Sequence, residues 1–594
     1  MIERNVQWVY PLSDKAVQAD VKKLMAETGL SKDEVIILYN RNIRTKEDIN
    51  NFLNLSLDNM CDPHQMKDAV KVAKVIAKHI NCNNKIVLYS DYDADGWGCV
   101  VVALKLLRRV GADIEWYANT REMGYGIKPE GVDEVLKKYP EAKLLVTSDN
   151  GIVGFEGIQH AIDCGLEVCV TDHHMPSSDG RLPECSGVVD PHRADETYPF
   201  DGLCGAGVIW KVCTLVYEEL GIDPKKCNCM LDVVALSTIA DCVPILYENR
   251  IIVTEGLRRI NKESKVVWTA MREVLQDARF ETCVTAKTIG FTYGPCINAC
   301  SRLMGNIELP VRPFLYDNDE KNLPLMRKDI ELMRDVNEER KALCNSQTDG
   351  VMTLIDAYVD DEVYVVWHPE LHEGVVGIIA GRIAEKYNKP CIVLTNSKAH
   401  PTVWKGSARS VPGFNLKEVL DQIQEKSIEE GVEGGYLAAY GGHEGAAGLT
   451  VNEEHLLGFK LAMLEKGEEL LSTDAIKKLV VDVVLTDENY APEYFDRMRA
   501  LEPFGEGFEM PVYGVRDFNP SEVSKFGGEE KDKHVKFIGK NVDFIAWNSQ
   551  KDWIDNFGEY EGEFNAIGEL RYDSYNGKMQ LTTMNIIDSF SPRK

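Results

Sequence analysis

The sequence has no apolar run long enough to cross a membrane and no excess of basic residues. None of its apolar stretches approaches the roughly 18 residues of a membrane-spanning helix, so we expect no membrane association. The first twenty residues lack the basic and then apolar layout of a secretory signal. Lysine and arginine total 67 against 95 aspartates and glutamates, a net charge of −28. This deficit argues against a protein that coats nucleic acid through bulk charge, but not against one that grips it locally.

Cysteine pairs at the spacing of a zinc ribbon are also missing. The 16 cysteines are scattered through 594 residues, and the closest two, Cys227 and Cys229, have no matching pair. Buried free thiols explain this distribution better than a disulfide framework does. Together with the missing secretory signal, reduced thiols indicate a cytoplasmic protein.

What is present is the composition of a folded protein, with 44% hydrophobic and 27% charged residues. Short apolar runs at 85–89, 143–147, 167–171 and 187–189 alternate with helical patterns, which predicts a parallel α/β sheet. A second α/β unit follows a charged helical stretch, and short strands with turn residues then predict a small β-barrel. We expect a helical arm (1–80), a large α/β domain (81–317), a connecting helix (318–348), a smaller α/β domain (349–466) and the barrel (467–594).

Acidic and histidine side chains follow three of the predicted strands directly. Because the carboxyl ends of parallel strands meet at one edge of a sheet, these side chains should lie close together. A buried helical pattern at 230–240 ends in another acid, Asp241. The polar groups that we expect at this edge are Asp91, Asp93, Asp95, Asp149, Asp172, His173, His174 and Asp241.

Buried carboxylates without partners are costly, so a cluster of them indicates bound cations. Carboxylate oxygens with one or two imidazoles suit Mn²⁺ or Mg²⁺ better than a thiolate-rich zinc site does. Several shared aspartates favour two ions, an arrangement that catalyses phosphoester hydrolysis. The first motif could also be read as a calcium-binding EF-hand loop. That reading fails because the loop position that requires glutamate is Val102.

The motifs around these residues resemble those of the DHH phosphoesterase superfamily and, within it, the RecJ-type exonucleases specific for single-stranded DNA. The matching segments run in family order over essentially the whole chain. They include SDYDADG (90–96), TSDNGI (147–152), VTDHH (170–174), LDVVALSTIADCVP (231–244), IGFTYGPCINACSRL (289–303), HEGVVGIIAGRIAEKY (372–387), KGSARSVPGFNL (405–416), YGGHEGAAGLTV (440–451) and LEPFGEGFEMPVY (501–513).

This resemblance implies a metal-dependent 5′→3′ exonuclease that releases mononucleotides from single-stranded DNA in repair and recombination, with two divalent ions, Mn²⁺ preferred and Mg²⁺ possible. It implies that Asp91 supports the ions or orients water, and that His174 contacts the scissile phosphate. It also implies a monomer that works with a helicase and a single-strand-binding protein. The implied metal ligands are Asp93, Asp95, Asp149, His173 and Asp241.

The second α/β unit resembles the DHH-associated domain, which implies contacts with the phosphate chain. Arginine suits this role because its planar fork matches phosphate oxygens, and glycine allows close approach of the backbone. The implied substrate-binding residues, besides His174, are Asn298, Arg302, Arg382, Ser407, Arg409, Gly442 and His443.

The last domain resembles an OB-fold, a barrel that binds single strands by stacking bases on aromatic rings. Aromatic residues in strands are more often core, so each candidate has two interpretations. The stacking candidates are Tyr513, Phe537, Trp547 and Tyr575, and Lys531, Lys533, His534 and Lys536 form a basic stretch beside them.

Some positions depart from the family pattern. Cys296 stands where arginine is usual, which predicts that one phosphate contact is lost or moved. Two other functions compete with the main one: hydrolysis of short RNA or cyclic dinucleotides by a DHH-family phosphodiesterase, and an inactive strand-binding scaffold. Neither fits as well, since the former enzymes generally lack the arm and barrel and the latter proteins lose acidic ligands.

Overall fold

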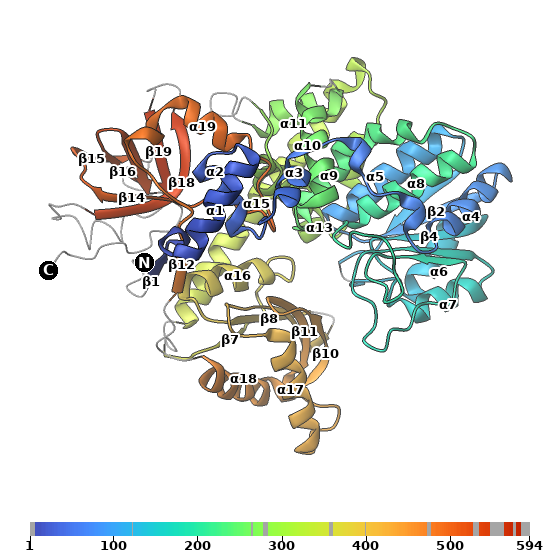
Figure 1. Ribbon diagram of the computed structural model, residues 1–594. Coiled ribbons are helices and arrows are strands. Elements are labelled where there is room, and N and C mark those ends of the chain that lie inside the picture. Colours follow the sequence, from blue (N-terminus) through green and yellow to red (C-terminus); the bar gives the residue numbers. More distant parts are fainter. Residues whose placement is uncertain are drawn as a thin grey trace.

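A five-stranded parallel sheet organises the largest lobe of the protein (Figure 1). The computed structural model describes residues 6–121, 123–262, 265–276, 283–355, 360–397, 400–471, 477–526, 534–546, 564–573 and 578–583. The spatial order of the strands is β3-β2-β4-β5-β6. Their bounds are β2 Lys85–Ser90, β3 Ile114–Ala118, β4 Ala142–Ser148, β5 Glu167–Thr171 and β6 Gly187–Val189.

Both faces of this sheet are covered by helices, which explains its continuous apolar strands. In β2, Ile86 and Leu88 face one core, whereas Val87 and Tyr89 face the other. The first core is shared with α4 (Ala69–Asn81), α5 (Ala94–Arg109) and α8 (Gly205–Glu219). The second is shared with α6 (Pro129–Lys138) and α7 (Phe155–Asp163). The parallel α/β fold predicted from the apolar runs is confirmed.

A helical layer continues the first core and leads into the second lobe. It contains α9 (Leu231–Ala240), α10 (Tyr247–Lys262), α11 (Val266–Leu275), α13 (Gly294–Met304) and α14 (Glu308–Leu315). The connecting helix α15 (Leu323–Ile355) buries Met326 and Ile330 in the large lobe and Val351 and Ile355 in the next one. One continuous helix therefore contributes to the cores on both sides of the junction.

The second lobe is a mixed sheet of spatial order β10-β11-β9-β8-β7. Helix α16 (Val376–Tyr387) covers one face, and α17 (Leu416–Glu429) and α18 (Leu456–Leu470) cover the other. The strands are β7 Tyr364–Trp367, β8 Cys391–Ser397, β9 His400–Arg409, β10 Leu437–Gly442 and β11 Ala446–Asn452.

The chain ends in a seven-stranded sheet whose core is shared with the N-terminal arm. Residues of α1 (Lys15–Thr28), α2 (Lys32–Asn40) and α3 (Lys46–Leu53) pack in one cluster with residues of the barrel strands. The arm also adds strand β1 (Val6–Val9) beside β12 (Lys477–Val480). The barrel contains β13 Val483–Val484, β14 Tyr513–Phe518, β15 Glu522–Phe526, β16 His534–Ile538, β17 Val542–Ala546, β18 Phe564–Asp573 and β19 Lys578–Thr583, and α19 (Pro492–Arg499) lies beside it.

Across the described parts of the chain, the helices are too short or too polar to span a membrane.

Candidate metal centre

The tight turn that joins β2 to α5 carries the first of the predicted metal ligands. Asp93 caps α5, because its carboxylate accepts hydrogen bonds from the backbone N–H groups of Asp95 at 2.9 Å and Gly96 at 3.0 Å. A side chain at position 96 would collide with the backbone carbonyl of Asp91, so only glycine fits this turn. The turn therefore places three carboxylates at the carboxyl end of β2.

The carboxylate of Asp95 is buried and points at the start of α8. It accepts hydrogen bonds from the N–H groups of Gly205 at 2.5 Å and Ala206 at 3.0 Å. These amides belong to the positive end of the helix dipole, which stabilises a negative charge. A Cβ at position 205 would approach both Asp149 and Asp95 within 3.0 Å, so glycine is required at this contact as well.

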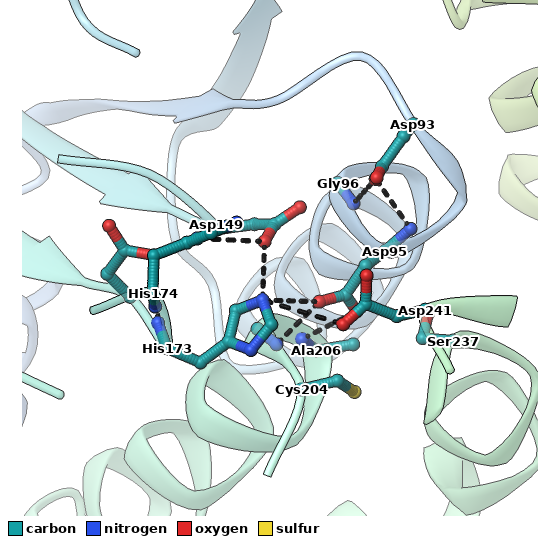
Figure 2. A network of polar contacts seen from close by, with 12 residues as sticks. Asp93, Asp95, Gly96, Asp149, His173, His174, Cys204, Ala206, Ser237 and Asp241 are labelled. Carbon is teal, nitrogen blue, oxygen red and sulfur yellow. Dashed lines mark hydrogen bonds and ion pairs between the residues drawn. The ribbon is translucent and has the colours of Figure 1, made fainter. Parts of the chain in front are cut away.

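His173 lies at the point where the acidic groups converge (Figure 2). Its Nε2 is 3.1 Å from Asp149 Oδ1 and 3.6 Å from carboxylate oxygens of both Asp95 and Asp241. These residues come from the ends of β5, β4 and α9 and from the first turn of α5. The backbone of Asp149 has φ 60°, a left-handed conformation that aspartate and asparagine tolerate better than most residues. The structure thus brings together the groups predicted to meet at this edge.

The carboxylates and imidazoles of this cluster are ligand types that bind divalent cations. Three overlapping groups offer ligand atoms within 4.8 Å of one another: Asp149 with both histidines, Asp95 with His173 and Asp241, and Asp91 with Asp93 and Asp149. The Oδ1 atom of Asp91 is buried without a hydrogen-bond partner. Buried carboxylates this close repel one another, and cations would remove that cost.

Burial and the neighbouring carboxylates raise the pKa of Asp91, Asp149 and Asp241 well above the usual value for aspartate, and that of Asp95 to about 6. In unfolded protein these groups ionise near pH 4. Between about pH 4 and pH 6 these four carboxyl groups together hold more protons in the folded metal-free protein than in the unfolded chain, so their contribution to stability falls as pH rises. The lowered pKa of His173 opposes this trend with one group against four. Above about 6 the penalty from Asp95 is fully present.

We therefore expect the unfolding temperature of the metal-free protein to be lower at pH 7.5 than at pH 5. Added Mn²⁺ should restore most of the difference at pH 7.5. The ion competes with protons, so its affinity should also rise over the same range. Thermal unfolding after chelation, with and without added Mn²⁺, measures both effects. If Mn²⁺ stabilised the protein more at pH 5 than at pH 7.5, the assignment of these carboxylates as ligands would be wrong.

The two adjacent histidines have opposite electrostatic properties. Burial lowers the pKa of His173 to about 3, which keeps the ring neutral and able to coordinate a cation. Burial also opposes the charge on His174, but its hydrogen bond with Asp172 outweighs this and raises its pKa to about 9. Nδ1 of His174 lies 2.8 Å from Asp172 Oδ1 and 2.9 Å from the hydroxyl of Tyr125. Tyr125 was not anticipated from the sequence, because only the tertiary fold brings it to this histidine.

The three arginines predicted to bind substrate, Arg302, Arg382 and Arg409, form no ion pair with a carboxylate in the described part of the chain. Arg302 donates to the carbonyl of Gly374 at 3.1 Å, and Arg409 donates to Ser407 Oγ at 2.7 Å. Arg382 donates to Asn345 Oδ1 at 2.7 Å. Burial first, and then Arg121 and Arg340, lower the pKa of Arg302 to about 10. Such a concentration of positive charge favours an anionic ligand.

The remaining predicted substrate-binding residues have varied positions. Asn298 on α13 accepts a hydrogen bond at 2.9 Å from the N–H of Ala94, so it braces the metal-site turn. Gly442 ends β10, and the following His443 is exposed. The sulfur of Cys296 accepts a hydrogen bond from Asn337 on α15 at 3.3 Å.

Of the two interpretations left open for the aromatic residues of the barrel, the structure supports the core for Tyr513 and Phe537. Tyr513 and Phe537 are only 3% and 7% exposed, since both belong to the core that the barrel shares with the arm. Within the basic stretch, Lys536 pairs with Asp543 at 2.9 Å. Trp547, Tyr575, Lys531 and Lys533 lie outside the described residues.

Three family models match successive parts of the chain. They are the DHH family, N-terminal domain, over residues 85–238, the DHHA1 domain over 360–473, and the RecJ OB domain over 481–586. The Bacillus subtilis protein named single-stranded-DNA-specific exonuclease RecJ is 29% identical over 595 residues, which cover 97% of this chain and 70% of that protein. Its Escherichia coli namesake is 29% identical, covering 85% of this chain and 88% of that protein.

A solved structure extends this likeness to three dimensions. The crystal structure of RecJ in complex with Mn²⁺ from Thermus thermophilus matches with a TM-score of 0.77 at 26% identity, over 98% of this chain and 79% of that one. The complex with Mg²⁺ shares the fold, with a TM-score of 0.70. The chain therefore belongs to the DHH phosphoesterase superfamily and to its RecJ branch, with the DHH, DHHA1 and OB domains in that order.

Proposed function

We propose that this protein is a metal-dependent exonuclease that hydrolyses single-stranded DNA from its 5′ end to mononucleotides, in DNA repair and recombination. The observation that carries the proposal is the group of buried carboxylates around His173 at one edge of the sheet. The likeness to proteins named single-stranded-DNA-specific exonuclease, along nearly the whole chain, supports it.

The proposed cofactors are two divalent ions, with Mn²⁺ preferred and Mg²⁺ possible. Asp93, Asp95, Asp149, His173 and Asp241 would hold them, and Asp91 would support this set. Bound ions of this kind supply a deprotonated water at neutral pH and neutralise charge that develops on the phosphate.

The protein's own groups position the substrate. His174 is cationic in the metal-free protein and is fixed by Asp172, whose other oxygen accepts the N–H of Ile152 at 2.9 Å. It is thereby suited to contact the scissile phosphate. Arg302, Arg409 and the adjacent Ser407 would hold the neighbouring phosphates with charge-assisted hydrogen bonds.

The proposed function also includes a cellular location, an oligomeric state and partner proteins. We infer a cytoplasmic monomer that acts on single strands exposed by a helicase and protected by a single-strand-binding protein. The names of the relatives support the DNA substrate, and the partners follow from the need for a single-stranded end.

The test is the digestion of matched single-stranded DNA, blunt duplex and single-stranded RNA with Mn²⁺. With single-stranded DNA, a label at the 5′ phosphate should appear at once as mononucleotide, whereas a 3′ label should pass through a ladder of shorter products. Blunt duplex should resist. A ladder of products from the 5′ label would mean that the protein degrades the strand from its 3′ end. A preference for short RNA would favour a different DHH-family phosphodiesterase.

A further inference from the structure

A second group of metal-binding side chains lies on α6 and α7. Asp133 comes from α6, and His160 and Cys164 come from α7 and its C-cap. The cysteine follows the histidine by four positions, so both lie on the same face of the helix. The imidazole Nε2 is 2.8 Å from Asp133 Oδ1 and 3.8 Å from the sulfur of Cys164. A carboxylate and a thiol therefore converge on the same ring nitrogen.

This group is distinct from the metal centre at the carboxyl edge of the sheet. Helix α7 starts just after the Asp149 loop and returns toward the beginning of β5. Its nine residues span about 13 Å, and Cys164 lies at the far end. All three side chains are at least partly exposed, so an ion could reach them from solvent.

We propose that Asp133, His160 and Cys164 bind a transition-metal ion of the Zn²⁺ type, with a water molecule as the fourth ligand. With Zn–N near 2.0–2.1 Å and Zn–S near 2.3 Å, a tetrahedral site separates nitrogen from sulfur by roughly 3.5 Å. The observed 3.8 Å is close to that value, and the 2.8 Å separation of histidine and aspartate opens with a small rotation of the exposed carboxylate.

The two sites offer different ligand types, and we therefore expect them to bind different ions. The carboxylate-rich centre around Asp149 suits hard cations such as Mn²⁺ and Mg²⁺, whereas a thiolate and an imidazole favour Zn²⁺ or Co²⁺. An ion at this second site would clamp α6 to α7 and leave the nuclease chemistry to the first centre.

The first test measures how fast Cys164 is alkylated in the full-length protein, with peptide mass spectrometry as the readout. In Mn²⁺-loaded protein, Zn²⁺ at ten times its dissociation constant should slow the modification about tenfold. Cys82, another exposed cysteine of the same lobe, serves as the internal control. Protection of Cys164 should disappear in His160→Gln. Equal protection of both cysteines, or protection that survives in His160→Gln, would overturn the proposal.

The second test uses Co²⁺ as a spectroscopic probe of the thiolate. Coordination by Cys164 should produce a sulfur-to-cobalt charge-transfer band in the near ultraviolet. The band should vanish in Cys164→Ser and persist in Cys82→Ser and in Asp149→Asn, since the last change affects only the nuclease centre. A wild-type protein without the band, or a band unchanged in Cys164→Ser, would rule out the site whether or not the nuclease assignment holds.

Discussion

Replacing Asp149 by asparagine is expected to lower exonuclease activity about a thousandfold while leaving the metal-free fold at least as stable as before. Asp149 belongs to two of the three overlapping ligand groups, so its loss weakens both candidate ion positions. A thousandfold loss corresponds to about 4 kcal/mol of transition-state stabilisation, the scale that a metal ion contributes to phosphoryl chemistry.

The expected gain in stability has a separate physical basis. Burial and four neighbouring aspartates raise the pKa of Asp149, which means that its ionised form is unfavourable in the metal-free fold. Asparagine has nearly the same shape, carries no charge and tolerates the left-handed backbone at φ 60°. It therefore removes a repulsive charge without straining the turn.

Two measurements separate these effects: steady-state digestion of single-stranded DNA with Mn²⁺, and thermal unfolding after chelation. Asp113→Asn provides the matched control, because Asp113 lies in the same lobe and its half-exposed carboxylate pairs with Lys85, away from the candidate metal ligands. The control should retain its activity. If Asp149→Asn retained more than a tenth of the activity, the metal-ligand role would be wrong, and if it unfolded the protein, Asp149 would be a structural residue.

The geometry of the metal centre was largely predictable, because two local rules determine it. Buried parallel strands appear as unbroken apolar runs, and residues that follow such strands share one edge of the sheet. Asp93, Asp149 and His173 follow from these rules alone. Strand β3 escaped prediction because it lies at the sheet edge, where Glu115 interrupts the apolar pattern and the residues after Ile114 are partly exposed.

The contact between the arm and the barrel was not predictable. The sequence indicated a helical arm and a barrel, but no local pattern shows that they share one core. The same limit applies to Tyr513 and Phe537: aromatic residues in strands are more often core, but the sequence alone leaves base stacking open for both. Only the packing of the arm against the barrel shows that these rings are buried.

A buried arginine lies where the large α/β lobe, the arm and the segment before β14 meet. Arg250 on α10 is 1% exposed, and its guanidinium donates to the backbone carbonyls of Phe52, Leu501, Glu502 and Pro503 at 2.7–3.3 Å. Its guanidinium carbon also lies 3.7 Å from the centre of the Phe52 ring. Burial lowers its pKa to about 9, yet the group stays protonated at neutral pH. It links the large α/β lobe to the arm and to the segment between α19 and β14.

We expect Arg250→Ala to lower the free energy of unfolding by roughly 3–5 kcal/mol, because it leaves several buried carbonyls without a donor and removes the packing of the long side chain. Arg250→Lys should lose less, since it retains the charge but not the planar fork. Urea unfolding followed by circular dichroism measures both changes. Arg258→Ala is the matched control, because that arginine lies on the same helix in a partly exposed pair with Glu255 and should cost less than about 1 kcal/mol. Equal losses for Arg250→Ala and Arg258→Ala would mean that water replaces the buried guanidinium, and that the arm, the catalytic lobe and the barrel are held together by their apolar core alone.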